Sequence, residues 1–197
     1  MRLRSWRGRR SRQALATSLL LFLAGCASLP AIDETRLAGA RAIEGRLSVR
    51  YKDLARDKED ALSGRFEWTQ NADGIELSLL DPLGQTVALI RSDANQSSIT
   101  FRDGRKVEGA TPEALTQETL GWTVPLRGLG AWLEGRPAAG SRAITLDDGR
   151  LRQDGWTIRF VREDETKASL PKRIDLSFPG PPAEIEMRLV IESRSGA

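Results

Sequence analysis

Apolar and polar residues alternate with a period of two along two long parts of this chain, from Arg46 to Phe101 and from Ala143 to Ile191. Such alternation predicts β-strands with one apolar and one polar face, paired as antiparallel hairpins. Residues 53–60 (DLARDKED) are expected to form a charged connection between the first two strands. Turn residues divide the pattern into eleven expected strands, at 46–51, 64–69, 75–79, 85–91, 97–101, 105–108, 143–146, 150–153, 156–162, 172–178 and 184–191.

The apolar period becomes helical between these two parts. Leu126, Leu129 and Leu133 recur at i, i+3 and i+7, with Trp132 beside them. This spacing predicts a helix with one apolar face, and the sheet can cover that face. We expect Trp122 and Trp132 to lie against the sheet.

Residues typical of helix ends divide this stretch into two short helices, within about residues 111–135. Thr111 before Pro112 is typical of an N-cap followed by the first helical position. Gly121 and Gly135 stand where helices commonly end. The helices are therefore expected to be joined through the residues that follow Gly121.

Eleven strands are too many for a comfortable flat sheet, so the sheet is expected to curl around its apolar face. A curled sheet with helices across its mouth either fills its interior with side chains or keeps a cavity. The pattern leaves both arrangements open. The residues expected to face inward are Leu47, Val49, Phe66, Trp68, Leu77, Leu79, Ile99, Phe101, Ile158, Phe160, Ile174, Leu176, Ile185, Met187 and Leu189.

The net charge of +3, from 30 basic and 27 acidic residues, is unevenly distributed. The first 25 residues hold six arginines and no acidic residue, and without them 24 basic residues face 27 acidic ones, a net charge of −3. The basic excess therefore belongs to a segment that is expected to be removed, and it does not indicate nucleic-acid binding.

The sequence has no histidine and one cysteine, which narrows its chemistry. Intramolecular disulfides, Ser–His–Asp or Cys–His catalysis and metal sites rich in His or Cys are excluded. Catalysis by carboxylates alone is the remaining route. Asp147, Asp148 and residues 163–165 (EDE) belong to expected turns and loops, so we expect no enzyme, no metal and no cofactor.

The N-terminus has the pattern of a bacterial export signal, in which arginines precede an apolar stretch from Ala14 to Ala24. That stretch is too short to span a bilayer as a helix. Leu23-Ala24-Gly25-Cys26 resembles a lipobox, which implies cleavage before Cys26 and acyl chains on that cysteine. An ordinary signal peptide that ends near an unrelated cysteine is the alternative. Ala27, where an aspartate would signal inner-membrane retention, indicates the outer membrane, and several acyl chains give a stable anchor.

These patterns divide the chain into three expected parts. Residues 1–25 are a signal peptide, residues 26–41 are a lipidated N-terminus and tether, and residues 42–197 form one domain. A domain of this length can bury a sizeable core.

Asp81-Pro82-Leu83-Gly84, between the third and fourth expected strands, suits a type I turn. The turn places Leu83 at its tip, where loops commonly carry a polar residue. Leu83 could fold back onto Leu80 or Val87, or be one of the singly exposed leucines that have no function. The functional hypothesis is a hydrophobic contact with a membrane.

Three groups of residues together resemble the LolB family, the outer-membrane receptors of the lipoprotein-sorting pathway. The resemblance covers essentially the whole mature domain, and the third group is the most specific in order and spacing. The groups are Pro82-Leu83-Gly84 after a strand, Gly121-Trp122-x-Val124-Pro125-Leu126, and Leu129-x-x-Trp132-Leu133-x-Gly135-x-Pro137.

The resemblance implies a mainly β fold, an incomplete antiparallel β-barrel of about eleven strands with a helical lid. Its interior would accept the acyl chains of lipoproteins from the periplasmic carrier LolA, and Leu83 would help to insert this cargo into outer-membrane lipids. The protein would be a monomer that is lipid-anchored and faces the periplasm. A static lipid-binding or scaffolding lipoprotein is the alternative. The expected acyl-chain contacts are the inward-facing residues named above, with Trp122, Leu126, Leu129, Trp132 and Leu133 from the lid.

Overall fold

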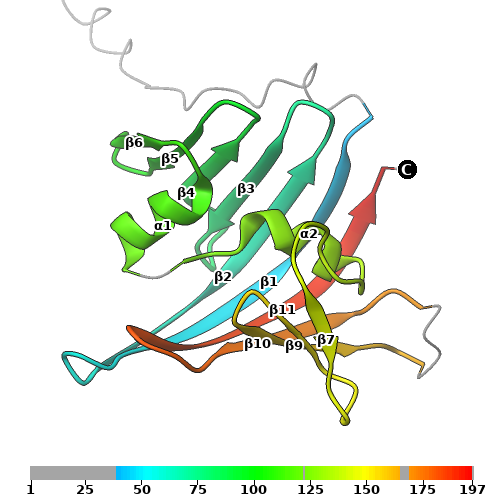
Figure 1. Ribbon diagram of the computed structural model, residues 1–197. Coiled ribbons are helices and arrows are strands. Elements are labelled where there is room, and N and C mark those ends of the chain that lie inside the picture. The colour runs from blue at the N-terminus through cyan, green and yellow to red at the C-terminus, as the bar shows by residue number, and fades with distance from the viewer. Residues whose placement is uncertain (1–38, 122, 165–168, 197) are drawn as a thin grey trace, which may run out of the picture. The chain divides into compact units, whose positions relative to one another are not determined.

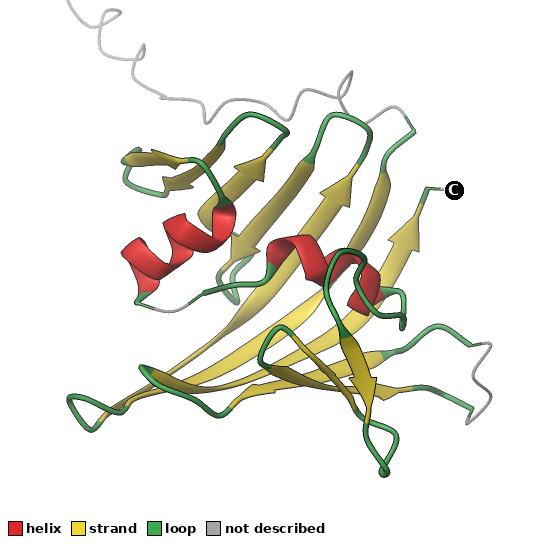
Figure 2. Ribbon diagram, viewed as in Figure 1, coloured by secondary structure: helices red, strands yellow, loops and turns green. Residues whose placement is uncertain are grey.

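The computed structural model describes residues 39–121, 123–164 and 169–196. Its strands form one antiparallel sheet in the order β6-β5-β4-β3-β2-β1-β11-β10-β9-β8-β7 (Figures 1 and 2). The elements are β1 (Arg41–Asp53), β2 (Lys58–Gln70), β3 (Ile75–Leu80), β4 (Thr86–Ser92), β5 (Ser97–Phe101), β6 (Lys106–Gly109), α1 (Pro112–Leu120), α2 (Leu126–Leu133), β7 (Ala143–Thr145), β8 (Leu151–Gln153), β9 (Trp156–Val161), β10 (Arg173–Phe178) and β11 (Ala183–Ser195).

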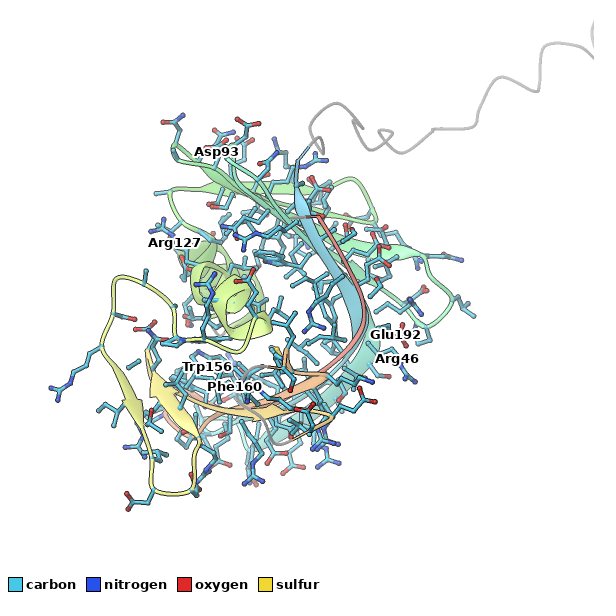
Figure 3. All side chains as sticks on the ribbon, turned by 90° about the vertical axis from the view of Figure 1, so that its right-hand side faces the viewer. Arg46, Asp93, Arg127, Trp156, Phe160 and Glu192 are labelled. Carbon is cyan, nitrogen blue, oxygen red and sulfur yellow. The ribbon has the colours of Figure 1, made fainter. Side chains whose placement is uncertain are left out.

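The sheet is strongly curved and open, and both helices lie on its concave side (Figures 1 and 3). Seen along the curve, Trp156 and Phe160 point inward, whereas Arg46 and Glu192 form an ion pair of 2.8 Å on the outer face (Figure 3). In the described part of the chain, β6 and β7 stand at the two ends of the strand order and do not pair with each other. The expected fold class, an incomplete barrel of eleven strands with two helices, is confirmed.

The prediction of a charged connection at residues 53–60 is wrong. β1 and β2 are 13 residues each and pair along their whole length, so the turn between them is only four residues long. The carboxylate of Asp53 closes this turn by accepting the backbone N–H groups of Ala55 and Arg56, at 2.9 and 3.0 Å. Residues 58–60 are exposed although they belong to a strand, so no apolar alternation marked them in the sequence.

The predicted boundaries of the two helices are confirmed. The Thr111 side chain accepts the N–H of Ala114 at 3.1 Å, and Gly121 ends α1 in the left-handed conformation, at a φ of 80°. Helix α1 packs on β4, β5 and β6 through the buried Leu115. It therefore covers one end of the sheet and leaves the remainder to α2.

Helix α2 lies directly on the sheet because Gly130 has no side chain. A Cβ atom at this position would lie 2.4 Å from the ring of Trp68 on β2. Trp132, on the same helix, is completely buried and donates its Nε1–H to Oε1 of Gln153 on β8, at 2.9 Å. The C-terminal half of α2 is thus tightly packed.

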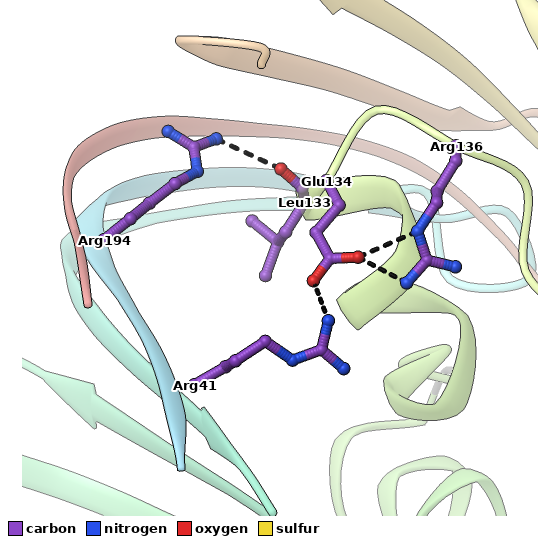
Figure 4. Close-up of polar contacts among 5 residues, drawn as sticks. All are labelled: Arg41, Leu133, Glu134, Arg136 and Arg194. Atoms are coloured by element: carbon purple, nitrogen blue, oxygen red, sulfur yellow. Dashed lines mark hydrogen bonds and ion pairs between the residues drawn. The ribbon is translucent and has the colours of Figure 1, made fainter. Parts of the chain in front are cut away.

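Arginine side chains hold the C-terminal end of α2 (Figure 4). Arg194 of β11 donates to the carbonyl oxygen of Leu133 at 3.1 Å and also to that of Pro171. Arg41 of β1 and Arg136 both pair with the carboxylate of Glu134. A guanidinium satisfies a free carbonyl at a helix C-terminus and complements the helix dipole, so this end of α2 is well fixed. At the other end, Pro125 provides no side-chain cap.

Replacing Gly130 by alanine tests the close approach of α2 to the sheet. Alanine favours a helix by about 1 kcal/mol over glycine, but overpacking a core costs about 1–3 kcal/mol. Because the clashing atoms belong to a buried ring, we expect a cost in the upper part of this range and a net fall in the free energy of unfolding of up to about 2 kcal/mol, measured by urea denaturation. Gly128→Ala is the milder control: its Cβ would lie 3.1 Å from the ring of Trp132 on the same helix, a tight contact that a small shift relieves, so it should be destabilised less. A Gly130→Ala protein at least as stable as both the wild type and this control would contradict the packing argument.

Candidate functional site

An apolar cavity lies between the concave face of the sheet and the roof formed by α2 and the residue before Pro125. Its volume is about 340 Å³. Strands β1, β2, β3, β4 and β11 supply its walls. It is lined by Leu47, Val49, Tyr51, Asp60, Ala61, Leu62, Phe66, Leu77, Leu79, Ile90, Val124, Leu129, Met187 and Leu189.

The structure brings eight of the residues expected at the acyl-chain site into the lining of this cavity. They are Leu47, Val49, Phe66, Leu77, Leu79, Leu129, Met187 and Leu189. The other six lining residues do not belong to the set expected from the sequence. Ile90 could have been found from the alternation along its strand. Residues 60–62 could not, because the charged residues at the start of β2 made this part of the strand look like a loop.

The other expected contacts pack against one another instead of lining the cavity. Trp132 and Leu133 fill the space under the C-terminal half of α2, and Ile99 lies on β5, one of the strands under α1. The interior is thus filled in one part and hollow in another. Trp122 lies outside the described residues. The remaining packed positions are Trp68, Phe101, Leu126, Ile158, Phe160, Ile174, Leu176 and Ile185.

The hollow part lies under Val124 and the N-terminal half of α2. Val124 and Leu129 contribute the roof side chains, and the linker before α2 is joined to α1 by a hydrogen bond of 2.9 Å from Val124 N–H to the buried hydroxyl of Thr116. Ligand pockets commonly have volumes of about 300–1,000 Å³, so this cavity is small for long acyl chains. A larger ligand would need more space than this cavity provides.

The loop between β3 and β4 is held in one conformation by Asp81. Its carboxylate oxygen Oδ1 accepts the N–H groups of Leu83 and Gln85, each at 2.9 Å. Its carbonyl oxygen accepts the N–H of Gly84 at 2.9 Å, which closes the predicted turn. Arg102 donates to Oδ2 at 2.9 Å. The hydrogen bond from Gln85, followed by that from Arg102, lowers the pKa of Asp81, so the carboxylate stays charged at a lower pH than an ordinary aspartate does.

This ordered loop holds Leu83 in solvent, with 84% of the residue exposed. The alternative in which Leu83 folds back onto Leu80 or Val87 is therefore excluded. Transfer of a leucine side chain from water to an apolar surface is favourable by about 1.5–3 kcal/mol. The loop is close to the cavity, since Leu79, four residues earlier, lines it.

Within residues 39–121, 123–164 and 169–196, no group of three acidic, histidine or cysteine residues could hold a metal ion. In the same residues, neither helix has the length and apolar character needed to cross a membrane. Cys26, the expected lipidation site, lies outside the described residues.

Known proteins resemble this chain over most of its length. An outer-membrane lipoprotein LolB of Cupriavidus necator is 32% identical over 183 residues, which cover 89% of this chain and 92% of that protein. The LolB of Chromobacterium violaceum is 31% identical and covers 92% of this chain and 98% of its own. That of Bordetella petrii is 35% identical over 79% of this chain and 81% of its own.

Among solved structures, a LolA superfamily protein from Nitrosomonas europaea has a TM-score of 0.43 and 11% identity, over 79% of this chain and 86% of that chain. This likeness is remote, so the assignment depends on the sequence relatives. The family model described as outer membrane lipoprotein LolB matches residues 40–193, nearly the whole described domain. The chain belongs to the LolB family.

Proposed function

We propose that this protein is an outer-membrane lipoprotein that accepts other lipoproteins from the carrier LolA and inserts them into the outer membrane. The observation that carries the proposal is the apolar cavity under a roof fixed at one end, close to an ordered loop that exposes a leucine. The names of the family relatives agree with the location. Acyl chains on Cys26 would provide the anchor.

The energetics of the cargo explain why a cavity is needed. Each CH₂ group removed from water contributes about 0.8 kcal/mol, so three acyl chains with roughly 45 CH₂ groups would cost about 36 kcal/mol to expose. Free diffusion of such a molecule through water is negligible. The chains must pass from one apolar environment directly to the next, and no nucleotide is needed if each environment binds them more favourably than the last.

The structure supports α2 as the part that adapts to cargo. Arg194 and Glu134 hold its C-terminal end, whereas its N-terminal half covers the hollow. Outward movement about the fixed end would enlarge the cavity without breaking the packing of Trp132. We therefore assign Val124 and Leu129 to the movable roof.

A static lipid-binding or scaffolding lipoprotein is the second candidate, because a cavity alone does not imply transfer. The two are separated by mixing the mature chain, made with Cys26→Ala so that it carries no acyl chains, with LolA that holds a labelled lipoprotein. We expect the label to move to this protein without added nucleotide, measured by separating the two proteins and counting the label. Label that stays on LolA would contradict the receptor function.

Replacing Leu83 by glutamate tests the insertion step. The loop should keep its conformation, because Asp81 holds it through the backbone of its neighbours. We expect transfer from LolA to be unchanged and insertion into vesicles to slow about tenfold or more, since the favourable burial of a leucine is replaced by the burial of a charge. Insertion is measured as label that cofloats with vesicles.

Leu170→Glu is the matched control, because Leu170 is also exposed, at 51%, but belongs to the loop before β10. It should insert cargo at the normal rate. Equal insertion rates for Leu83→Glu and the wild type would rule out a role for Leu83 in membrane contact.

A further inference from the structure

The first half of β2 has a free edge. β2 pairs with β1 along its whole length, but with β3 only through Arg65–Gln70. In the described part of the chain, residues 58–64 pair with no strand on the β3 side. In Figure 1 this segment extends with β1 beyond the β3–β4 loop.

The backbone groups that face this edge can be identified. The N–H of Ala61 is accepted by the side chain of Asp60 at 2.8 Å, so it is not used in the pairing with β1. Backbone groups of a strand point alternately to its two sides, so those of Glu59 and Ser63 face the same edge. An exposed edge of this kind is a template for the addition of another strand.

The free edge also forms part of the cavity rim. Asp60, Ala61 and Leu62 line the cavity, and Leu62 is 55% exposed. At the end of the segment, Gly64 lies so close to β3 that a Cβ atom would be 2.1 Å from the carbonyl oxygen of Leu80. The edge therefore runs from the tip of the β1–β2 hairpin to the base of the Leu83 loop.

We propose that the polypeptide of a bound lipoprotein, immediately after its acylated cysteine, adds to this edge as an extra strand. The inference rests on the proposed function, because acyl chains in the cavity are covalently attached to a polypeptide that must leave across the rim. Residues 58–63 offer a strand length of about 20 Å, enough for about six cargo residues. Recognition through backbone hydrogen bonds is independent of sequence, so one edge can serve cargos that share only their acylated end.

The charges of Lys58, Glu59 and Asp60 keep the edge from binding strands permanently. Charged side chains on an edge are a common protection against aggregation, and Asp60 covers one donor in the absence of a partner. An incoming strand displaces that exposed carboxylate and forms hydrogen bonds with the backbone groups of Ala61 and of Glu59 and Ser63 on either side of it. The added strand is consequently reversible, as delivery of the cargo requires.

Two synthetic ligands test the proposal on the mature chain that carries Cys26→Ala. One is a triacylated cysteine methyl ester, and the other is the same cysteine followed by ten residues. We expect the peptide to tighten binding about fivefold or more, the contribution of a single backbone hydrogen bond. The amide protons of Glu59 and Ser63 should exchange more slowly with the lipopeptide than with the methyl ester.

Ser63→Pro should remove this gain, because proline lacks the outward N–H and leaves the pairing with β1 intact. Ser63→Ala keeps the N–H and should bind as the wild type does. If Ser63→Pro does not fold, two lipopeptides replace it, each N-methylated at one of the two alternate sets of amides. The one whose methylated amides would face the edge should bind no better than the methyl ester.

The outcomes separate the two proposals. Binding of the methyl ester supports the cavity irrespective of the edge, and its absence would count against the proposed function. Equal affinities for the two ligands, or an unchanged lipopeptide affinity in Ser63→Pro, would overturn the added strand. Slow exchange of the edge amides in the absence of lipopeptide would also overturn it, because another strand would then already occupy the edge. If dilution restores fast exchange, that strand comes from a second copy of the chain. If removal of residues 27–38 restores it, the strand is the chain's own tether.

Discussion

The structure depends on covering one apolar face of an open, curved sheet. The helix that performs most of this work, α2, has eight residues and is therefore only about 12 Å long. It cannot fill the concavity of an eleven-stranded sheet. Trp132 and Gly130 bring its C-terminal half into full contact with the strands, and the space under the other half remains hollow. The cavity is thus a direct result of the mismatch between a short helix and a wide sheet.

Leu83 and Leu62 are exposed apolar side chains on ordered backbone next to the cavity. Leu83 is exposed although four polar contacts of Asp81 fix its loop, and Leu62 is exposed on a fully paired hairpin. Disorder does not explain either leucine. An apolar side chain held in solvent by a rigid backbone can contact another apolar surface with little further loss of backbone conformational entropy.

The sequence predicted those elements whose local chemistry determines them. The strands with apolar alternation, the N-cap at Thr111 and the helix end at Gly121 all agree with the structure. The first part of β2 was missed because its residues are exposed on both faces, so the sequence shows no apolar alternation there. Backbone hydrogen bonds to β1 hold this segment, and such bonds do not depend on the side chains. Which part of the interior is packed and which is hollow could not be predicted from the sequence either, since it depends on how closely Gly130 approaches Trp68. The exposure of Leu83, in contrast, was among the expected alternatives.

The place where the domain begins would set a geometric requirement on a lipid anchor at Cys26. Arg41 pairs with Gln70, at the far end of β2 from the Leu83 loop, and the intervening strand is about 20 Å long. If Cys26 holds the domain to a bilayer, residues 26–40 must span this height for Leu83 to meet the same leaflet. Fifteen residues can reach about 50 Å when fully extended, so a tether of this length would allow the end of the domain that carries Leu83 to contact the bilayer.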